Sequence, residues 1–196
     1  VVFRKGEPGA SSYDAVVSGV KSLIDRYDFI DKDRIALNGH SWGGYQIAFL
    51  VTRTNMFKAA VSGAPVVNMT SAYGGIRWES GKSRMFQYEQ TQSRIGGTLW
   101  DKPAEFIRNS PLFFLPQVQT PVLIMHNDKD GSVMWEQGIE FFMALRRLDK
   151  PVWLFNYKGE GHHLKKWENR LDYSRRVMEF YDYYLKDGKK PEWMKS

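Results

Sequence analysis

The chain has 196 residues, of which 42% are hydrophobic, 26% charged and 15% aromatic. This composition is that of a globular chain with enough apolar side chains for a core, and it excludes disordered and collagen-like proteins. No apolar run is longer than Ile47 to Val51, and the mean hydropathy is −0.48. A membrane helix needs about 20 apolar residues, so we expect no membrane span. The absence of cysteine excludes disulfide scaffolds and thiol nucleophiles but leaves the compartment open, periplasmic or secreted as well as cytoplasmic.

Charge and the start of the chain add two expectations. Lys and Arg number 28 against 22 Asp and Glu, a formal net charge of +6. The basic residues come as scattered pairs among acids rather than as a stripe, so we expect no nucleic-acid partner. The chain begins Val1-Val2-Phe3-Arg4, with neither Met nor a signal segment. We therefore expect a piece of a longer protein.

Apolar runs alternate with amphipathic segments along the chain, the pattern of an α/β protein. The first helix is expected over Ser12 to Tyr27, behind a capping box at Ser11 to Asp14. A strand at Arg34 to Asn38 breaks at Gly39, and a helix follows over Tyr45 to Thr54. The later elements are three strands and two helices: Lys58 to Val61, Pro121 to His126, Val152 to Tyr157, Gly138 to Leu148 and Tyr173 to Tyr184. Four strands joined by helices predict a parallel sheet.

The stretch from Asn68 to Pro116 is polar, aromatic and rich in glycine, without a sustained period. A segment of that length inside a compact domain is usually functional. It is expected either to form short helices over the mouth of a site or to be an irregular packed excursion.

Gly39-His40-Ser41-Trp42-Gly43 matches the pattern G-x-S-x-G between a predicted strand and a predicted helix. In that context the serine sits on a strained turn, and the flanking glycines allow the chain to pass close to its neighbours. Ser41 is the candidate nucleophile, and the backbone N–H of Trp42 is the candidate oxyanion donor. The alternative is a glycine-rich turn with a solvated serine.

A serine nucleophile needs a base and a group that orients the base. Asp128 and Asp130 both follow the third strand. We favour Asp130, which lies farther into the loop and directly before Gly131, whereas Asp128 is expected to cap the turn.

Four histidines compete for the role of base. His40 is expected to point away from the site, and both His40 and His126 are expected to be structural through hydrogen bonds to loop backbone. His162 follows Gly161 in the loop after the fourth strand and is favoured, with His163 as the alternative. Because His162 and His163 are adjacent and there is neither H-E-x-x-H nor cysteine, we expect no metal site and no cofactor.

Several segments together resemble the catalytic domain of the prolyl oligopeptidase family of serine peptidases, which includes dipeptidyl peptidase IV and acylaminoacyl peptidase. They are DAVVSGVKSLIDRYDFIDKDRIALNGHSWGGY, FKAAVSGAPVVN, TPVLIMHNDKDGSV with the Gln137 that follows, NYKGEGHHL and RRVMEFYDYYLK. The resemblance implies an α/β-hydrolase fold. It also implies a triad of Ser41, Asp130 and His162, because the family carries its triad at matching positions.

The resemblance also implies what lies outside this chain. Residues 1–196 would form the C-terminal half of the catalytic domain, about strands five to eight, without the first half of the sheet and the N-terminal β-propeller. The isolated piece would then be a weak enzyme or inactive. Its first strand would be an exposed edge, which predicts self-association of the piece.

For the substrate site, the resemblance implies an apolar pocket lined by Trp42, Val66 and Val133, with Met69 where a tryptophan would close it. The alternative for Met69, and for Tyr73 and Trp78, is simple core packing. The expected function is cleavage of peptide bonds in oligopeptides through an acyl-enzyme. An esterase on the same fold and a catalytically silent interaction domain are the alternatives.

Overall fold

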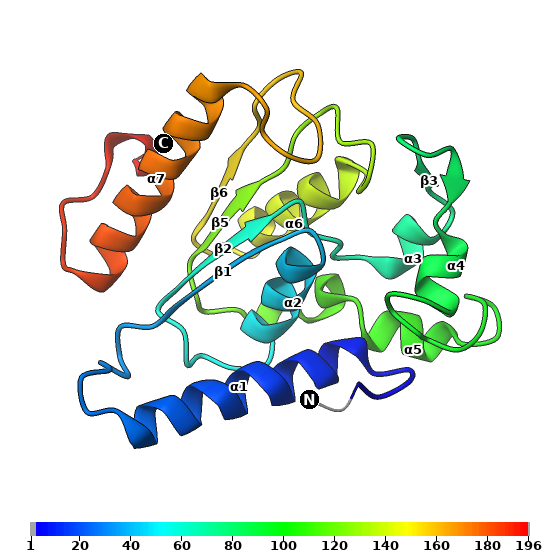
Figure 1. Ribbon diagram of the computed structural model, residues 1–196, viewed down its shortest axis with the longest axis horizontal. Coiled ribbons are helices and arrows are strands. Elements are labelled where there is room, and N and C mark those ends of the chain that lie inside the picture. The colour runs from blue at the N-terminus through cyan, green and yellow to red at the C-terminus, as the bar shows by residue number, and fades with distance from the viewer. Residues whose placement is uncertain (1–2, 196) are drawn as a thin grey trace.

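Four parallel strands form the centre of the fold (Figure 1). The structure is a computed structural model that describes residues 3–195. The strands, in their order across the sheet, are β1 (Ala36–His40), β2 (Ala59–Gly63), β5 (Val122–Met125) and β6 (Val152–Phe155). All three pairings are parallel. This confirms the predicted parallel sheet, and it brings the carboxyl ends of all four strands to one edge.

Helices cover both faces of the sheet because the strand side chains alternate between them. Ala60 packs in one core cluster together with Ile47 of α2 (Trp42–Val51) and Phe141 of α6 (Glu136–Arg147). Ala59 and Val61 face the opposite way, towards α7 (Trp167–Leu185). The first helix, α1 (Pro8–Arg26), lies against α2. The result is a layered fold with the sheet in the middle (Figure 1).

The predicted capping box at the start of α1 is wrong. The helix begins at Pro8, a residue type that suits the first helical position because its missing N–H would have no partner there. Ser11 and Ser12 lie inside the first turns, and their hydroxyls donate to the carbonyls of Glu7 and Pro8, at 2.8 and 2.9 Å. The serines therefore bond backwards within the helix rather than capping it.

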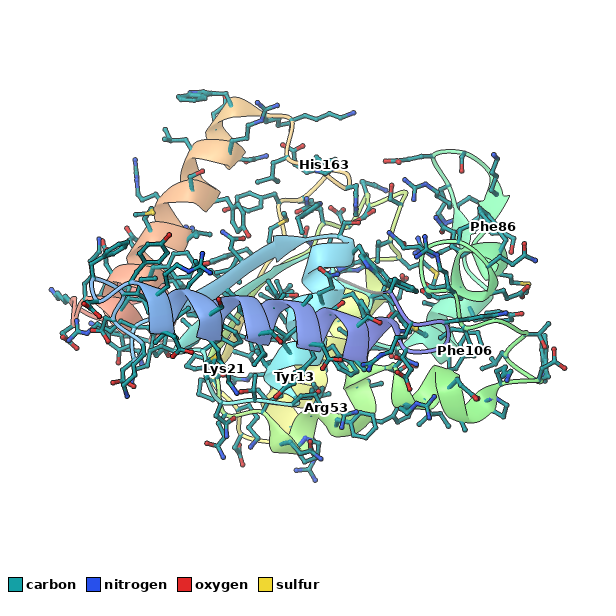
Figure 2. All side chains as sticks on the ribbon, turned by 60° about the horizontal axis from the view of Figure 1, so that its bottom comes forward. Tyr13, Lys21, Arg53, Phe86, Phe106 and His163 are labelled. Carbon is teal, nitrogen blue, oxygen red and sulfur yellow. The ribbon has the colours of Figure 1, made fainter. Side chains whose placement is uncertain are left out.

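The stretch from Asn68 to Pro116, expected either to form short helices or to be an irregular packed excursion, folds into short helices and strands. They are α3 (Met69–Tyr73), β3 (Ile76–Arg77), β4 (Lys82–Ser83), α4 (Met85–Glu89), α5 (Pro103–Arg108) and the 3-10 helix η1 (Pro111–Gln117). Outside this segment, a second 3-10 helix, η2 (Glu192–Met194), follows α7. A buried cluster with Tyr73, Tyr88 and Phe106 packs α3, α4 and α5 against one another. Phe106 lies in this subdomain on one side of the sheet, far from His163 in the loop before α7 (Figure 2).

Candidate active site

Ser41 occupies the single position between β1 and α2. Its φ of 59° and ψ of −117° lie in a region that residues with side chains rarely adopt. The surrounding hydrogen bonds hold it there, because Ser41 N–H donates to the carbonyl of Gly63 at 2.8 Å and Tyr45 N–H donates to the carbonyl of Ser41 at 3.0 Å. The Ser41 hydroxyl does not cap the helix. The first N–H groups of α2, beginning with Trp42, have no partner within the helix and are available to an anion.

Close packing at this turn requires Gly39 and Gly44, but not Gly43. A Cβ on Gly39 would lie 2.8 Å from the backbone of Gly43, and a Cβ on Gly44 would lie 2.4 Å from the carbonyl oxygen of Gly63. A Cβ on Gly43 would meet nothing within 4 Å. From the sequence, we expected both Gly39 and Gly43 to be needed to avoid a steric clash. This holds for Gly39 but not for Gly43, and the second position without room for a side chain is Gly44.

This difference predicts opposite effects for two neighbouring substitutions. Gly44→Ala pushes β2 away from α2 and should lower the free energy of unfolding by about 2–3 kcal/mol, the usual effect of overpacking. Gly43→Ala is the matched control and should not lower it, because alanine is the better helix former by about 1 kcal/mol. Urea unfolding of the two variants measures both values. Equal losses in the two variants would contradict this account.

Asp130 and His162 meet at the carboxyl ends of the two strands that precede them. Nδ1 of His162 lies 2.7 Å from Oδ2 of Asp130, and both side chains are buried. The other carboxylate oxygen, Oδ1, accepts the backbone N–H groups of Ser132 and Val133, each at 2.8 Å. These bonds fix the carboxylate, and the carboxylate in turn fixes the orientation of the His162 ring. Nε2, the other ring nitrogen of His162, does not take part in the contact with Asp130.

His126 is a second histidine that contacts the carboxylate of Asp130. Its Nε2 lies 3.2 Å from Oδ2 of Asp130 and 3.1 Å from the carbonyl oxygen of Val133. Both neighbours are acceptors, so Nε2 carries the proton and donates. Burial alone would raise the pKa of Asp130, but the hydrogen bonds from His126 and His162 outweigh it and hold this pKa well below its ordinary value. The expected structural role of His126, bonded to loop backbone, agrees with these contacts.

The alternative candidates have other partners. Oδ1 of Asp128 accepts the backbone N–H of Gly159 at 2.7 Å, so this aspartate ties its loop to the loop that carries the histidines. His163 is exposed, and no hydrogen bond joins it to Asp130 in the described part of the chain.

Between residues 3 and 195 no hydrogen bond links Ser41 to His162. Ser41 directly follows His40, whose ring centroid lies 4.7 Å from that of His162.

The expectation that His40 points away from the site is wrong. Its ring packs against those of both His162 and His163, with ring centroids 4.7 Å apart in each case. The sheet forces this position, because the ring stands directly over Gly63 of the neighbouring strand. Burial, followed by the nearby His162 and His163, lowers the pKa of His40 to about 4.

This lowered pKa predicts an acid-side loss of stability. The unfolded chain protonates His40 near its ordinary pKa of 6.5, whereas the folded protein does so only near 4. The unfolded state thus binds more protons between these values, and the free energy of unfolding should fall as the pH drops through that window. His40→Gln should make this fall shallower, measured by urea unfolding across the window. An unchanged pH dependence in the variant would show that His40 does not titrate as described.

The four residues expected to bind substrate come together in one apolar cluster. Val66, Met69 and Val133 are buried in it, and the half-buried Trp42 ring stacks on Tyr45 at a centroid distance of 4.4 Å. Met69 is fully buried. The core-packing alternative agrees with the burial of Met69 and Tyr73, whereas Trp78 is 73% exposed and is not a core residue.

Two positioning residues had no distinct signal of their own in the sequence. Glu160 accepts the backbone N–H groups of Lys165 and Lys166, at 2.8 and 2.9 Å, and so closes the loop around His162. Asn127 donates from Nδ2 to the carbonyl of Gly161 at 2.8 Å and ties the two loops together. A glutamate between two glycines and an asparagine after a strand are common in any loop. Only the folded chain shows what these side chains hold.

The strained serine turn between β1 and α2, followed by an Asp–His pair after later strands of a parallel sheet, defines the chain as part of an α/β-hydrolase catalytic domain. The model of the prolyl oligopeptidase family matches residues 4–188. The chain belongs to the prolyl oligopeptidase family. Within residues 3–195, no helix has the length and apolar character needed to cross a membrane.

Curated and solved relatives agree with this family. The chain is 31% identical to the uncharacterized peptidase YuxL of Bacillus subtilis over 83% of its own length, and 28% identical to the acylamino-acid-releasing enzyme of Rattus norvegicus over 88%. It spans 23% of the length of each. The acylaminoacyl peptidase of Pyrococcus horikoshii has the same fold, with a TM-score of 0.83 and 20% identity over 98% of this chain and 30% of that one.

Proposed function

We propose that the protein containing this chain is a serine peptidase that cleaves peptide bonds of oligopeptides through an acyl-enzyme. The observation that carries the proposal is the buried 2.7 Å contact between Asp130 and His162 at the sheet edge where the strained Ser41 lies. A carboxylate that orients an imidazole beside a serine is the arrangement that activates a hydroxyl. The peptidase names of the relatives support the choice of peptide over other acyl compounds.

The proposed reaction has two halves. Ser41 Oγ attacks the carbonyl carbon of the scissile bond while its proton moves to Nε2 of His162, and Asp130 stabilises the imidazolium that forms. The Trp42 N–H donates to the oxyanion of the tetrahedral intermediate. His162 then passes the proton to the leaving amine, which departs and leaves an ester on Ser41. Water loses a proton to Nε2 of His162 as it attacks this ester. His162 then returns that proton to Ser41 Oγ as the acyl–oxygen bond breaks, which releases the acid and free Ser41.

We propose that the substrate side chain next to the scissile bond is apolar and contacts the half-buried Trp42, with Val66, Met69 and Val133 packed behind it as the buried wall of the substrate site. Their common apolar cluster, directly behind the serine turn, supports this. Because Met69 is unbranched and flexible, it would adapt to side chains of different shape more readily than a rigid aromatic ring.

Kinetics on matched substrates test the reaction class. We expect the intact protein to hydrolyse a peptide and a p-nitrophenyl ester with the same acyl group. We also expect the same kcat for both wherever breakdown of the shared acyl-enzyme limits the rate. Hydrolysis of the ester without any of the peptide would indicate an esterase. No turnover of either class across a peptide and ester panel would indicate a silent interaction domain and refute the proposal.

We further propose that residues 1–196 work as the C-terminal part of a larger catalytic domain, preceded by the rest of the sheet and a β-propeller. The chain spans only 23% of its curated relatives, and β1 pairs with β2 alone in the described sheet. An unpaired strand edge binds further strands, from the same chain or from a second copy. Sedimentation of the isolated 196-residue piece should therefore reveal self-association, and a monomer at high concentration would contradict it.

A further inference from the structure

Three imidazole rings converge beside the serine turn. His40, His162 and His163 each offer one ring nitrogen, and these three atoms all lie within 4.8 Å of one another. The ring centroids are 4.7 to 4.9 Å apart in every pair. His40 comes from the end of β1, whereas the other two come from the loop after β6. The sequence expectation of no metal site did not foresee this cluster, because the fold brings the first histidine to the other two.

Two of the rings have a nitrogen that is open to a new ligand. Nε2 of His40 is buried and has no hydrogen-bond partner among the described residues. Nδ1 of His162 is bound to Asp130, and this contact leaves Nε2 as the nitrogen that faces outward. A histidine whose other nitrogen donates to a carboxylate is the usual arrangement of a zinc-bound histidine, since the carboxylate fixes the ring and makes the ligand more basic.

We propose that the three histidines form a binding site for one Zn²⁺ ion. Imidazole nitrogen is a ligand that Zn²⁺ prefers, and three histidines with water as the fourth ligand make a complete tetrahedral set. The carboxylate of Asp130 behind His162 supplies the outer-shell partner.

The three nitrogens need only a small closure to bind the ion. With Zn–N bonds of about 2.0–2.1 Å, tetrahedral ligand nitrogens lie about 3.3 Å apart. They lie within 4.8 Å here. His163 is the residue that can move to close the gap, because its side chain is exposed, while His162 and the neighbouring Asp130 are buried.

The consequence for activity rests on the proposed function. A Zn²⁺ ion on Nε2 of His162 occupies the atom that must accept the proton from Ser41. Bound zinc therefore blocks the hydrolase reversibly, and a chelator restores it. Mg²⁺ does not bind at this site, because it prefers oxygen ligands and retains its water.

The test is a zinc titration of the intact protein, produced without a histidine tag and freed of metal with a chelator. Isothermal titration should give one Zn²⁺ per chain, and Co²⁺ should give the visible absorption of a four-coordinate ion. His163→Gln removes one exposed ligand and should weaken binding by more than about tenfold, since loss of even an outer-shell partner weakens a site by 10- to 100-fold. Lys165→Gln, an exposed change in the same loop, is the matched control and should bind zinc as the unmodified protein does.

The outcomes separate this proposal from the proposed function. Absence of zinc binding, or equal affinity in His163→Gln and Lys165→Gln, overturns the site whether or not the protein is a hydrolase. One zinc per chain with a weakened His163→Gln variant supports the site even if the metal-free protein hydrolyses nothing, and in that case only the proposed function falls. Circular dichroism of both variants checks that each is folded, so that weakened binding is not mistaken for unfolding.

Discussion

Replacing Ser41 by alanine is expected to reduce kcat by about 10⁴- to 10⁶-fold, because it removes the proposed nucleophile and with it the proposed acyl-enzyme route. The free energy of unfolding should stay within about 0.5 kcal/mol, because the hydroxyl does not cap α2 and alanine keeps the same Cβ in the same strained backbone. Steady-state kinetics on a peptide substrate and urea unfolding of the intact protein measure the two quantities.

A second serine supplies the control for this prediction. Ser80 is exposed in the loop between β3 and β4. Among the residues that the structure describes, its hydroxyl makes only one hydrogen bond, a long one of 3.4 Å to the carbonyl of Arg77. Ser80→Ala should leave kcat unchanged. A Ser41→Ala variant with a kcat near that of the parent would mean that the hydrolysis comes from another residue.

Replacing Asp130 by asparagine is expected to lower kcat by about 10⁴-fold and to destabilise the fold by about 1–3 kcal/mol. The amide can still accept the N–H groups of Ser132 and Val133 through its oxygen. Its NH₂ group would then face Nδ1 of His162 and Nε2 of His126, where the carboxylate now accepts. The conflict leaves buried donors unpaired, which releases the His162 ring from its fixed orientation, or it moves the His162 proton to Nε2. Either outcome impairs His162 as the proposed base.

The acid stability of this variant provides an independent readout. The pKa of Asp130 in the folded protein lies below its ordinary value, so its contribution is present above about pH 4 and is lost as the pH falls towards the folded value. Asp130→Asn should therefore lose stability at neutral pH and show a shallower acid transition. Asp128→Asn, which keeps the oxygen that accepts Gly159 N–H, is the matched control and should change kcat by less than a few-fold. Equal losses in both variants would contradict the assignment.

The sequence predicted those features whose signal is local. Apolar runs ending in glycine or polar residues located all four strands of the sheet, and the strand–serine–helix context located Ser41. Asp130 could be favoured over Asp128 because a loop that turns over a sheet edge places its later residue farther over the site. The 2.7 Å contact with His162 agrees with that choice.

The remaining features depend on contacts between distant segments. Gly44 is tight because Gly63 of the next strand passes over it, and no pattern around Gly44 indicates this. The direction of the His40 ring follows from the register of β1 against β2, in which His40 lies opposite Gly63. Nothing in the sequence distinguishes Glu160 from other acidic loop residues. Its role depends on the loop fold, which brings the N–H groups of Lys165 and Lys166 to its carboxylate. Local patterns therefore identified the candidate triad but not the contacts that hold it.

The most direct test of the central claim is covalent labelling of the intact protein with a fluorophosphonate, followed by peptide mass spectrometry. An activated serine attacks the phosphorus and expels fluoride, so the adduct marks the nucleophile itself. We predict one adduct per chain, on Ser41, and none on the Ser41→Ala variant. Equal labelling of the parent and the Ser41→Ala variant, or an adduct on a different residue, would contradict the account.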